Sequence, residues 1–132
     1  MLNDSEALLL SGETNLVRAG HAVRAMGPKF VILKKGEHGA MLFSHDGVFV
    51  VPAYPTEKVE DPTGAGDSFA GGIMACLAVD GTHLHGRLRR AMAYGTVVAS
   101  LTVEDFGLRR LVNTSKAEID QRLQTYREML SF

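Results

Sequence analysis

The spacing of apolar and polar residues divides the chain into alternating helical and extended segments. In residues 14–26 the apolar positions recur at helical spacing, and Gly27-Pro28 ends that pattern. Short apolar runs then predict strands at residues 30–33, 40–43 and 48–51. His45-Asp46-Gly47 predicts a hairpin turn between the last two strands. The order of helix, strand and hairpin favours an α/β fold in which helices cover a sheet.

The N-terminal segment has the pattern of a capped helix. Asn3-Asp4-Ser5-Glu6 precedes a run of good helix formers, and Ser11-Gly12 interrupts that run. Asn3 or Asp4 is expected to be the N-cap, because a short polar side chain can accept a hydrogen bond from the first turn. On the residues alone, Glu6 is an acidic residue of that first turn.

The second half of the chain is predicted to be mainly helical. Its first helix, residues 68–79, is dense in Gly and Ala, which permits close approach of neighbouring elements. Phe69, Ile73 and Leu77 lie at helical spacing along it. We therefore expect this helix to be central and buried, with Asp80-Gly81 at its end.

Two more helices are expected towards the C-terminus. The first, residues 84–101, carries its inner residues at Leu88, Met92, Gly95, Val98 and Ala99. The second follows Ser115-x-x-Glu118, which has the form of a capping box. Its apolar positions repeat at helical spacing, so we expect an amphipathic helix there.

The segment Asp61-Pro62-Thr63-Gly64-Ala65-Gly66-Asp67 connects the strands to the Gly- and Ala-rich helix. Gly64, Ala65 and Gly66 have almost no side chain, so their backbone N–H groups are accessible to a ligand. The first N–H groups of a helix have no intrahelical partner, and together these groups predict an anion pocket. Asp67 places a carboxylate beside that pocket. A simpler interpretation is a helix entry with small residues for packing and an aspartate favoured by the macrodipole.

Composition indicates an ordinary globular domain of 132 residues, with 45% hydrophobic and 22% charged residues. A net charge of −1 gives no electrostatic reason to expect nucleic acid or a membrane as partner. The single cysteine, Cys76, is expected to be a buried free thiol, which suits a reducing cytoplasm. No targeting segment is evident.

Several other classes of site find no support in the sequence. Of the five histidines, three fall in a predicted helix or in turns, and His83 and His85 have no nearby Cys or carboxylate at ligand spacing, which argues against zinc. The phosphate-loop pattern G-x-x-x-x-G-K-[ST] is missing, as is a G-x-G-x-x-G pattern after a strand. A P-loop NTPase is therefore excluded, and no motif supports a dinucleotide site.

Residues 61–72 resemble the C-terminal signature D-T-x-G-A-G-D of the ribokinase-like, or PfkB, carbohydrate kinases. They read Asp61-Pro62-Thr63-Gly64-Ala65-Gly66-Asp67-Ser68-Phe69-Ala70-Gly71-Gly72. Pro62 stands where Thr is common. The resemblance implies a three-layer αβα fold with a Rossmann-like sheet, and transfer of the ATP γ-phosphate to a hydroxymethyl group of a sugar or nucleoside. It also implies that Asp67 accepts the hydroxyl proton while the Gly64, Ala65 and Gly66 amides stabilise the transferring group.

Two further motifs resemble the same family. Asn3 and Glu6 match its N-x-x-E motif, whose Glu helps to organise Mg²⁺ and phosphate, and the resemblance implies a water-mediated role for both. The turn containing Lys34, Gly36 and Gly39 resembles the family's T-x-G-x-x-G segment along the nucleotide. Lys34 replaces the usual Thr there, so a cationic contact to phosphate is the expected substitute.

The resemblance assigns two more positions. Gly95 occupies the place on its helix that flanks adenine in the family, where Asn is frequent. Backbone carbonyls of the segment ending at Gly107, with Asp61 and Thr63, correspond to residues that bind a monovalent cation such as K⁺ in many members.

The resemblance extends over residues 1–132 but matches only the C-terminal half of the family pattern. We therefore expect a C-terminal nucleotide-binding and catalytic portion, without the N-terminal half and lid, that is incomplete for turnover. An exposed sheet edge and homo-oligomeric association are expected with it. Two alternatives stay open: a non-catalytic nucleotide-binding or regulatory module, and a vitamin kinase acting on pyridoxal or a hydroxymethylpyrimidine.

Overall fold

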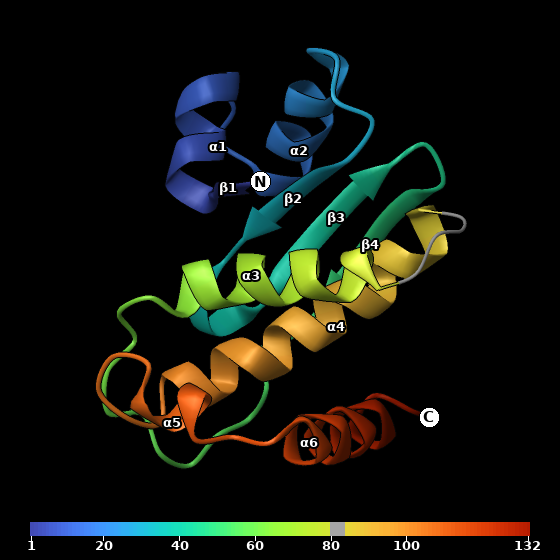
Figure 1. The fold of residues 1–132 in the computed structure, drawn as a ribbon. Coiled ribbons are helices and arrows are strands. Elements are labelled where there is room, and N and C mark those ends of the chain that lie inside the picture. The colour runs from blue at the N-terminus through green and yellow to red at the C-terminus, as the bar shows by residue number, and fades with distance from the viewer. Residues whose placement is uncertain (80–83) are drawn as a thin grey trace. The chain divides into compact units, whose positions relative to one another are not determined.

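A computed structural model describes residues 1–79 and 84–132 of the chain (Figure 1). The described residues form an α/β structure with one four-stranded sheet. The chain divides into two compact units, Met1–Ala53 and Tyr54–Phe132. The predicted end of the Gly- and Ala-rich helix at Asp80-Gly81 lies outside the described residues.

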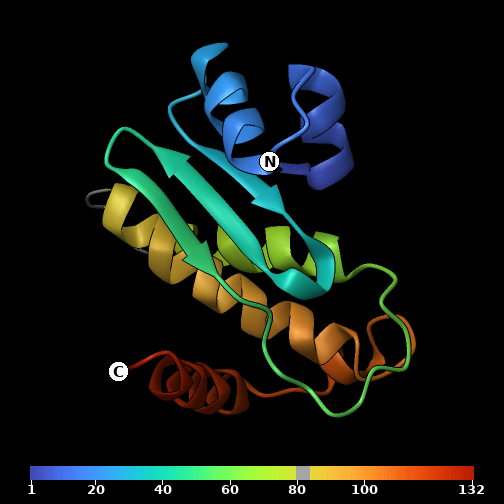
Figure 2. The same ribbon diagram turned by 180° about the vertical axis from the view of Figure 1, so that it is seen from behind.

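The first unit contains the sheet and two helices. Its elements are β1 Leu2–Asn3, α1 Asp4–Ser11, α2 Leu16–Ala25, β2 Val31–Lys34, the 3₁₀ helix η1 Gly36–His38, β3 Ala40–Ser44 and β4 Gly47–Val51. The strands follow one another in the order β1-β2-β3-β4. β1 runs parallel to β2, whereas β2, β3 and β4 are antiparallel neighbours. The predicted hairpin is confirmed, and Figure 2 shows it as the pair β3 and β4.

Helices α1 and α2 lie on the same face of this sheet (Figures 1 and 2). Their core residues and alternate residues of β2 and β3 form one buried cluster: Ala7, Ala19, Val23, Val31, Leu33, Met41 and Phe43. Gly20 permits the close contact of α2 with β3, because a Cβ there would stand 2.3 Å from the Phe43 ring. The predicted helical cover is thus present on this face.

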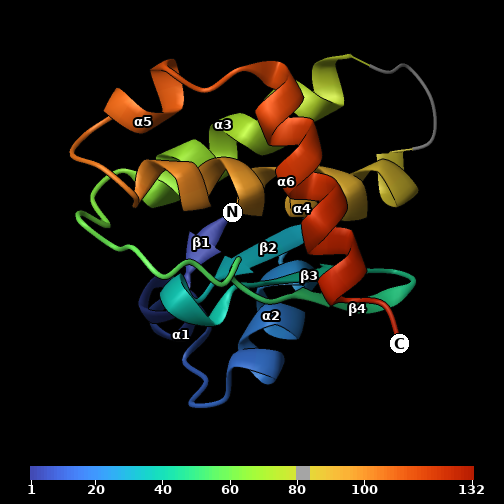
Figure 3. The same cartoon turned by 90° about the horizontal axis from the view of Figure 1, so that it is seen from below.

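The second unit is helical in its regular part. Its helices are α3 Ala65–Ala78, α4 Leu84–Thr102, α5 Arg109–Val112 and α6 Lys116–Met129. α3 and α4 lie side by side, and α6 crosses α4 (Figure 3). α3 begins at Ala65, earlier than the predicted Ser68, because Gly64 reverses the chain and Ala65 at once adopts helical geometry. The short α5 was not predicted.

α3 and α4 pack with their backbones in close contact. A Cβ on Gly72 would stand 2.8 Å from the Gly95 Cα, and a Cβ on Gly95 would stand 2.6 Å from the Phe69 carbonyl oxygen. Near the start of α3, the Thr102 hydroxyl donates to the Ser68 hydroxyl over 2.7 Å, and both groups are buried. The contact of these two helices therefore requires glycine at two facing positions.

The prediction that α3 is central and buried holds for only one side of the helix. Phe69 and Ile73 are buried, but Met74 is 66% exposed and Ala75 is also exposed. Cys76 is a free thiol that is half-buried rather than buried. Small residues allow close packing on one side of a helix, but they do not require cover on every side.

The predicted capping box at Ser115 is only half formed. The Ser115 hydroxyl accepts from the Glu118 N–H over 3.2 Å, as expected of an N-cap. The Glu118 carboxylate instead pairs with the Arg110 guanidinium. A bond between two charged groups is stronger than a bond from a neutral N–H to a carboxylate, which explains the difference.

Candidate functional site

The start of α3 has an open cap. Gly64 is the N-cap in the left-handed conformation, with φ 82° and ψ −4°, and no side chain caps the helix. The Ala65 N–H donates to the Pro62 carbonyl over 3.2 Å. Among the described residues, nothing accepts from the N–H groups of Gly66 and Asp67. Unbonded N–H groups at the positive end of a helix form a favourable place for an anion.

This helix start is accessible. A Cβ built on Gly64 would meet no atom within 4 Å, so the space before the helix is open. Asp67 is the third residue of α3, and its side chain is exposed. The predicted catalytic residues Gly64, Ala65, Gly66 and Asp67 therefore lie together around one accessible helix terminus.

The segment that leads into Gly64 is held by the end of α4. The Glu60 and Asp61 N–H groups both donate to the Val103 carbonyl oxygen, over 2.8 and 3.3 Å. Figures 1 and 3 show this segment beside the loop that follows α4. The Asp61 carboxylate accepts from the Thr63 N–H over 2.9 Å.

Of the predicted monovalent-cation residues, Asp61 and Thr63 thus contact each other. Hydrogen bonds from the Thr63 side chain and backbone lower the pKa of Asp61, so its carboxylate is ionised at neutral pH. Gly107 lies in the loop between α4 and α5 with φ 60°. An ionised carboxylate suits a hard cation, and the assignment of these three residues stays a prediction.

In the first unit, two predicted motifs meet at one edge of the sheet. Asn3 ends β1 and Lys34 ends β2, and these two residues are paired neighbours in parallel strands. The chain continues from Asn3 into α1 and from Lys34 into the turn with Gly36 and Gly39. The carboxyl ends of parallel strands are the common location of ligand sites in α/β proteins.

Asn3 and Glu6 form a complete capping box. The Asn3 side chain accepts from the Glu6 N–H over 2.7 Å, and Glu6 Oε2 accepts from the Asn3 N–H over 2.8 Å. Of the two predicted N-cap residues, Asn3 or Asp4, Asn3 is the one observed. Both side chains have a local structural role, and Glu6 Oε1 is the carboxylate oxygen outside these bonds.

The turn after β2 also has structural reasons for its glycines. Gly36 and Gly39 both have positive φ, 55° and 83°. A Cβ on Gly39 would stand 2.1 Å from the Val51 carbonyl oxygen, and the Lys35 N–H donates to the Gly39 carbonyl over 2.8 Å. Contact of this turn, with Lys34, to a nucleotide stays a prediction.

Gly95 lies in the middle of α4 and is buried against α3. Its missing side chain is explained by the Phe69 carbonyl oxygen, which leaves no room for a Cβ. This packing is sufficient reason for glycine. The position of Gly95 beside adenine stays a prediction.

A partly buried ionic cluster centred on Glu104 was not predicted from the sequence. Arg122 donates to both carboxylate oxygens of Glu104, over 2.6 and 3.2 Å, and Arg110 Nε donates over 3.3 Å. Burial alone would raise the pKa of Glu104, but the bonds from Arg122, Thr56 and Arg110 and the charge of Arg122 lower it overall. The partners are distant in sequence, so no local pattern indicates this cluster.

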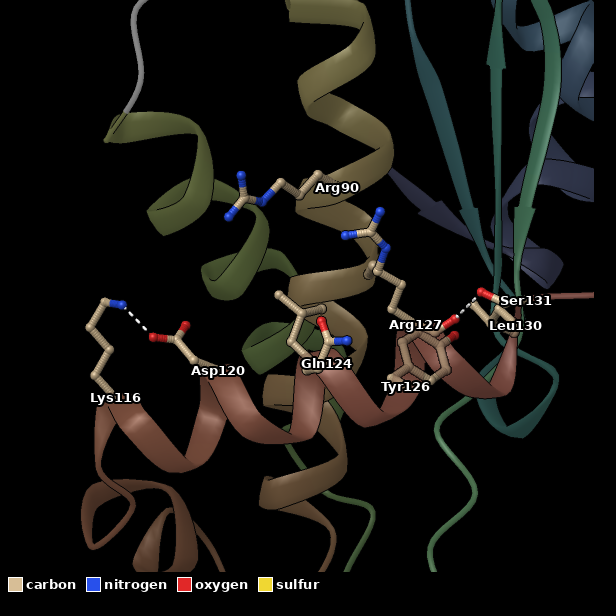
Figure 4. Close-up of a pocket in the computed structure, with 10 residues that line it drawn as sticks. Arg90, Lys116, Asp120, Gln124, Tyr126, Arg127, Leu130 and Ser131 are labelled. Atoms are coloured by element: carbon tan, nitrogen blue, oxygen red, sulfur yellow. Dashed lines mark hydrogen bonds and ion pairs between the residues drawn. The ribbon is translucent and has the colours of Figure 1, made fainter.

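A pocket of about 800 Å³ lies between α4 and α6 (Figure 4). Its lining includes Arg90, Lys116, Asp120, Tyr126 and Arg127. Lys116 is bonded to Asp120 over 2.5 Å. None of the predicted site residues lines this pocket, so it is separate from the helix start described above.

The described residues offer neither a metal-ligand cluster nor a membrane-spanning helix. No group of three or more His, Cys, Asp or Glu side chains there could hold a metal ion. The same part of the chain has no helix with the length and apolar character needed to span a membrane.

The family model described as pfkB family carbohydrate kinase matches residues 1–115. Over 120 residues, the chain is 32% identical to the bifunctional ribokinase/ribose-5-phosphate isomerase A of Fructilactobacillus sanfranciscensis; the match covers 87% of this chain and 21% of that protein.

Solved structures show the same similarity. The aminoimidazole riboside kinase of Salmonella enterica, complexed with aminoimidazole riboside and an ATP analog, matches with a TM-score of 0.80 and 28% identity, over 92% of this chain and 40% of that chain. A putative Ribokinase II from E. coli, in complex with ATP and Mg²⁺, matches with a TM-score of 0.71 and 36% identity, over 94% and 38%. The chain spans less than half the length of each of these relatives.

Proposed function

Because the chain belongs to the pfkB family of carbohydrate kinases, we propose that it is the C-terminal, nucleotide-binding and catalytic portion of an ATP-dependent phosphotransferase. The acceptor is a hydroxymethyl group of a sugar or nucleoside. The observation that carries this proposal is the start of α3, where unbonded N–H groups and the exposed Asp67 carboxylate surround one open space.

The chemistry follows from these groups. The acceptor hydroxyl oxygen forms a bond to the γ-phosphorus, the bond from that phosphorus to the bridging oxygen breaks, and ADP leaves. Asp67 takes the hydroxyl proton, a role worth roughly 10²- to 10⁴-fold in rate. The Gly66 and Asp67 N–H groups donate to the transferring phosphoryl oxygens, and one such donor is worth on the order of 3 kcal/mol.

Magnesium and a monovalent cation fit the remaining residues to different degrees. Glu6 retains one carboxylate oxygen outside its capping box, which suits a water-mediated contact to Mg²⁺. When bound, Mg²⁺ neutralises charge on the phosphates. The ionised Asp61 carboxylate, held by Thr63, suits K⁺ beside the loop of Gly107.

The relatives support the substrate class. Their names state a bifunctional ribokinase/ribose-5-phosphate isomerase A, an aminoimidazole riboside kinase complexed with an ATP analog, and a putative Ribokinase II in complex with ATP and Mg²⁺. Because this chain spans less than half of each, phosphate transfer is proposed for the whole protein, and nucleotide binding is the part proposed for the described residues. The second candidate is a nucleotide-binding module that transfers no phosphate.

Calorimetric titration of the 132-residue chain with ATP and Mg²⁺ tests the proposal. Gly64→Ala should weaken binding, because its side chain would enter the open space before the amides. Gly12→Ala is the matched control, since Gly12 also has positive φ, 70°, and open space around it but caps the end of α1. Equal affinity of the two variants would contradict the proposed site.

A panel of sugars and nucleosides with ATP then separates the two candidates. Phosphate transfer that depends on Asp67 supports the kinase. Nucleotide binding without transfer to any acceptor, in a protein that also carries the remaining segments of its relatives, supports the binding module.

A further inference from the structure

Residues 54–61 form neither helix nor strand, and two consecutive residues hold them at both ends. Near one end, the Thr56 hydroxyl donates to Glu104 Oε1 over 3.2 Å. At the other end, the Glu60 and Asp61 N–H groups donate to the Val103 carbonyl oxygen. The position of this segment therefore depends on how residues 103 and 104 are held.

Glu104 is itself fixed from the opposite side. Its carboxylate lies between the guanidinium groups of Arg122 and Arg110, and the Glu104 and Arg122 side chains are only 15% and 17% exposed. Arg122 also donates to the Ser100 hydroxyl over 3.1 Å and lies 5.1 Å above the centre of the Tyr54 ring. A two-pronged bond from arginine fixes both the position and the plane of the carboxylate.

The link between this carboxylate and the Val103 carbonyl is covalent. The Val103 C=O and the Glu104 N–H belong to one planar peptide group, so they turn together. The Glu104 N–H donates to the Leu101 carbonyl over 3.4 Å, which is a long bond at the frayed end of α4. The side-chain bonds of Glu104 are accordingly the stronger restraint on this peptide group.

We propose that Glu104 is a positioning residue that, through the Val103 carbonyl, sets the path of residues 60–63 and so aims the open amides of α3 at phosphate. The described contacts run from Arg122 on α6 to Glu104, then to Val103, and from there to the loop that ends at Gly64. The expected effect of Glu104 on nucleotide affinity rests on the proposed function. The expected effect of Glu104 on the position of residues 60–63 is independent of that function.

Hydrogen exchange followed by NMR on the 132-residue chain tests the positioning itself. Glu104→Gln keeps the shape of the side chain but loses its charge. We expect about tenfold faster exchange of the Glu60 and Asp61 amides, with interior amides of α3 and α4 unchanged, because bonds to a charged group are worth more than neutral ones. Asp120→Asn is the matched control, because it breaks the exposed pair with Lys116 on the same α6.

Calorimetry supplies the second readout. Glu104→Gln should weaken binding of ATP and Mg²⁺ about tenfold, while Asp120→Asn changes it less than twofold. Arg122→Lys retains the positive charge but cannot bond both carboxylate oxygens of Glu104 as the planar guanidinium does, so we expect an intermediate effect on exchange and on affinity. This variant serves as the test if Glu104→Gln does not fold.

The outcomes are distinguishable. Unchanged exchange at residues 60 and 61, or equally faster exchange throughout the chain, overturns the inference and leaves Glu104 a role in stability alone. Faster exchange at residues 60 and 61 in a chain whose parent binds no nucleotide supports the positioning and overturns the proposed function instead.

Discussion

Helices α1 and α3 begin in opposite ways. α1 is closed by its own residues, since Asn3 and Glu6 each satisfy a backbone N–H of the other. α3 begins at Gly64 with no side-chain cap, and N–H groups of its first turn have no acceptor among the described residues. An N-cap side chain is typically worth about 1 kcal/mol, so α3 forgoes a stabilisation that α1 uses.

The two helix starts are stabilised by different kinds of contact. α1 is stabilised locally, by residues within one turn. α3 is stabilised by tertiary contacts instead: the Ser68 hydroxyl to Thr102, the Gly72 backbone against Gly95, and the Val103 carbonyl ahead of the helix. A helix start supported from outside can leave its own amides open for a ligand.

The largest effect is expected at the open start. Asp67→Asn should lower phosphate transfer by roughly 10²- to 10⁴-fold in any form of this protein that turns over, because no base then accepts the hydroxyl proton. ADP release with a sugar and nucleoside panel measures it. The affinity for ATP should change little. A variant that keeps a third or more of the activity would exclude Asp67 as the base.

Alanine substitutions at two adjacent glycines, Gly71 and Gly72, test whether the close packing of α3 against α4 stabilises the protein. Gly72→Ala should destabilise the protein by about 1–3 kcal/mol, because its Cβ would stand 2.8 Å from the Gly95 Cα. Gly71→Ala is the control and should stabilise by about 0.5–1 kcal/mol, since it meets no atom within 4 Å and alanine favours a helix. Urea unfolding measures both. Equal effects would show that the close contact is not needed.

The local support of α1 predicts a smaller loss. Asn3→Ala should lower the free energy of unfolding by about 1 kcal/mol, because the Glu6 N–H loses its acceptor. Asn3→Asp retains a cap and should remain close to the parent protein in the same urea experiment. If both variants lost equal stability, the strand pairing of Asn3 rather than its cap would be the cause.

The ionic contacts of Glu104 predict that the stability of the protein depends on pH. Because the pKa of Glu104 is lowered by folding from its ordinary 4.5, its contribution to stability is complete above that value and is lost as the pH falls through the lower, folded pKa. Glu104→Gln should therefore reduce the acid dependence of the urea midpoint below pH 5. An identical pH profile for the parent and Glu104→Gln would contradict this account.

Much of the fold could be predicted from periodicity and turn residues. The helix after Thr14, the strands after Pro28 and the hairpin at Asp46-Gly47 all appear as expected. The start of α3 was placed too late, because Ala65 and Gly66 were interpreted as loop residues although they can continue a helix from Gly64. Short-range signals were reliable where no tertiary contact competed with them.

The candidate site could be predicted only in part. The residues at the start of α3 share one short segment, so sequence indicated them directly. Glu118 was assigned to a capping box, but Arg110 competes for it. Glu104 and Arg122 meet only after folding, and no spacing in the sequence records that contact.

Cys76 follows Gly72 by one helical turn and lies on the same side of α3, half-buried and unpaired. Because it is the sole thiol in the chain, a reagent such as a disulfide dye can modify only this position. The rate at which Cys76 is labelled will rise whenever α3 and α4 separate from each other. The protein therefore carries an intrinsic chemical probe of that event, without any added label.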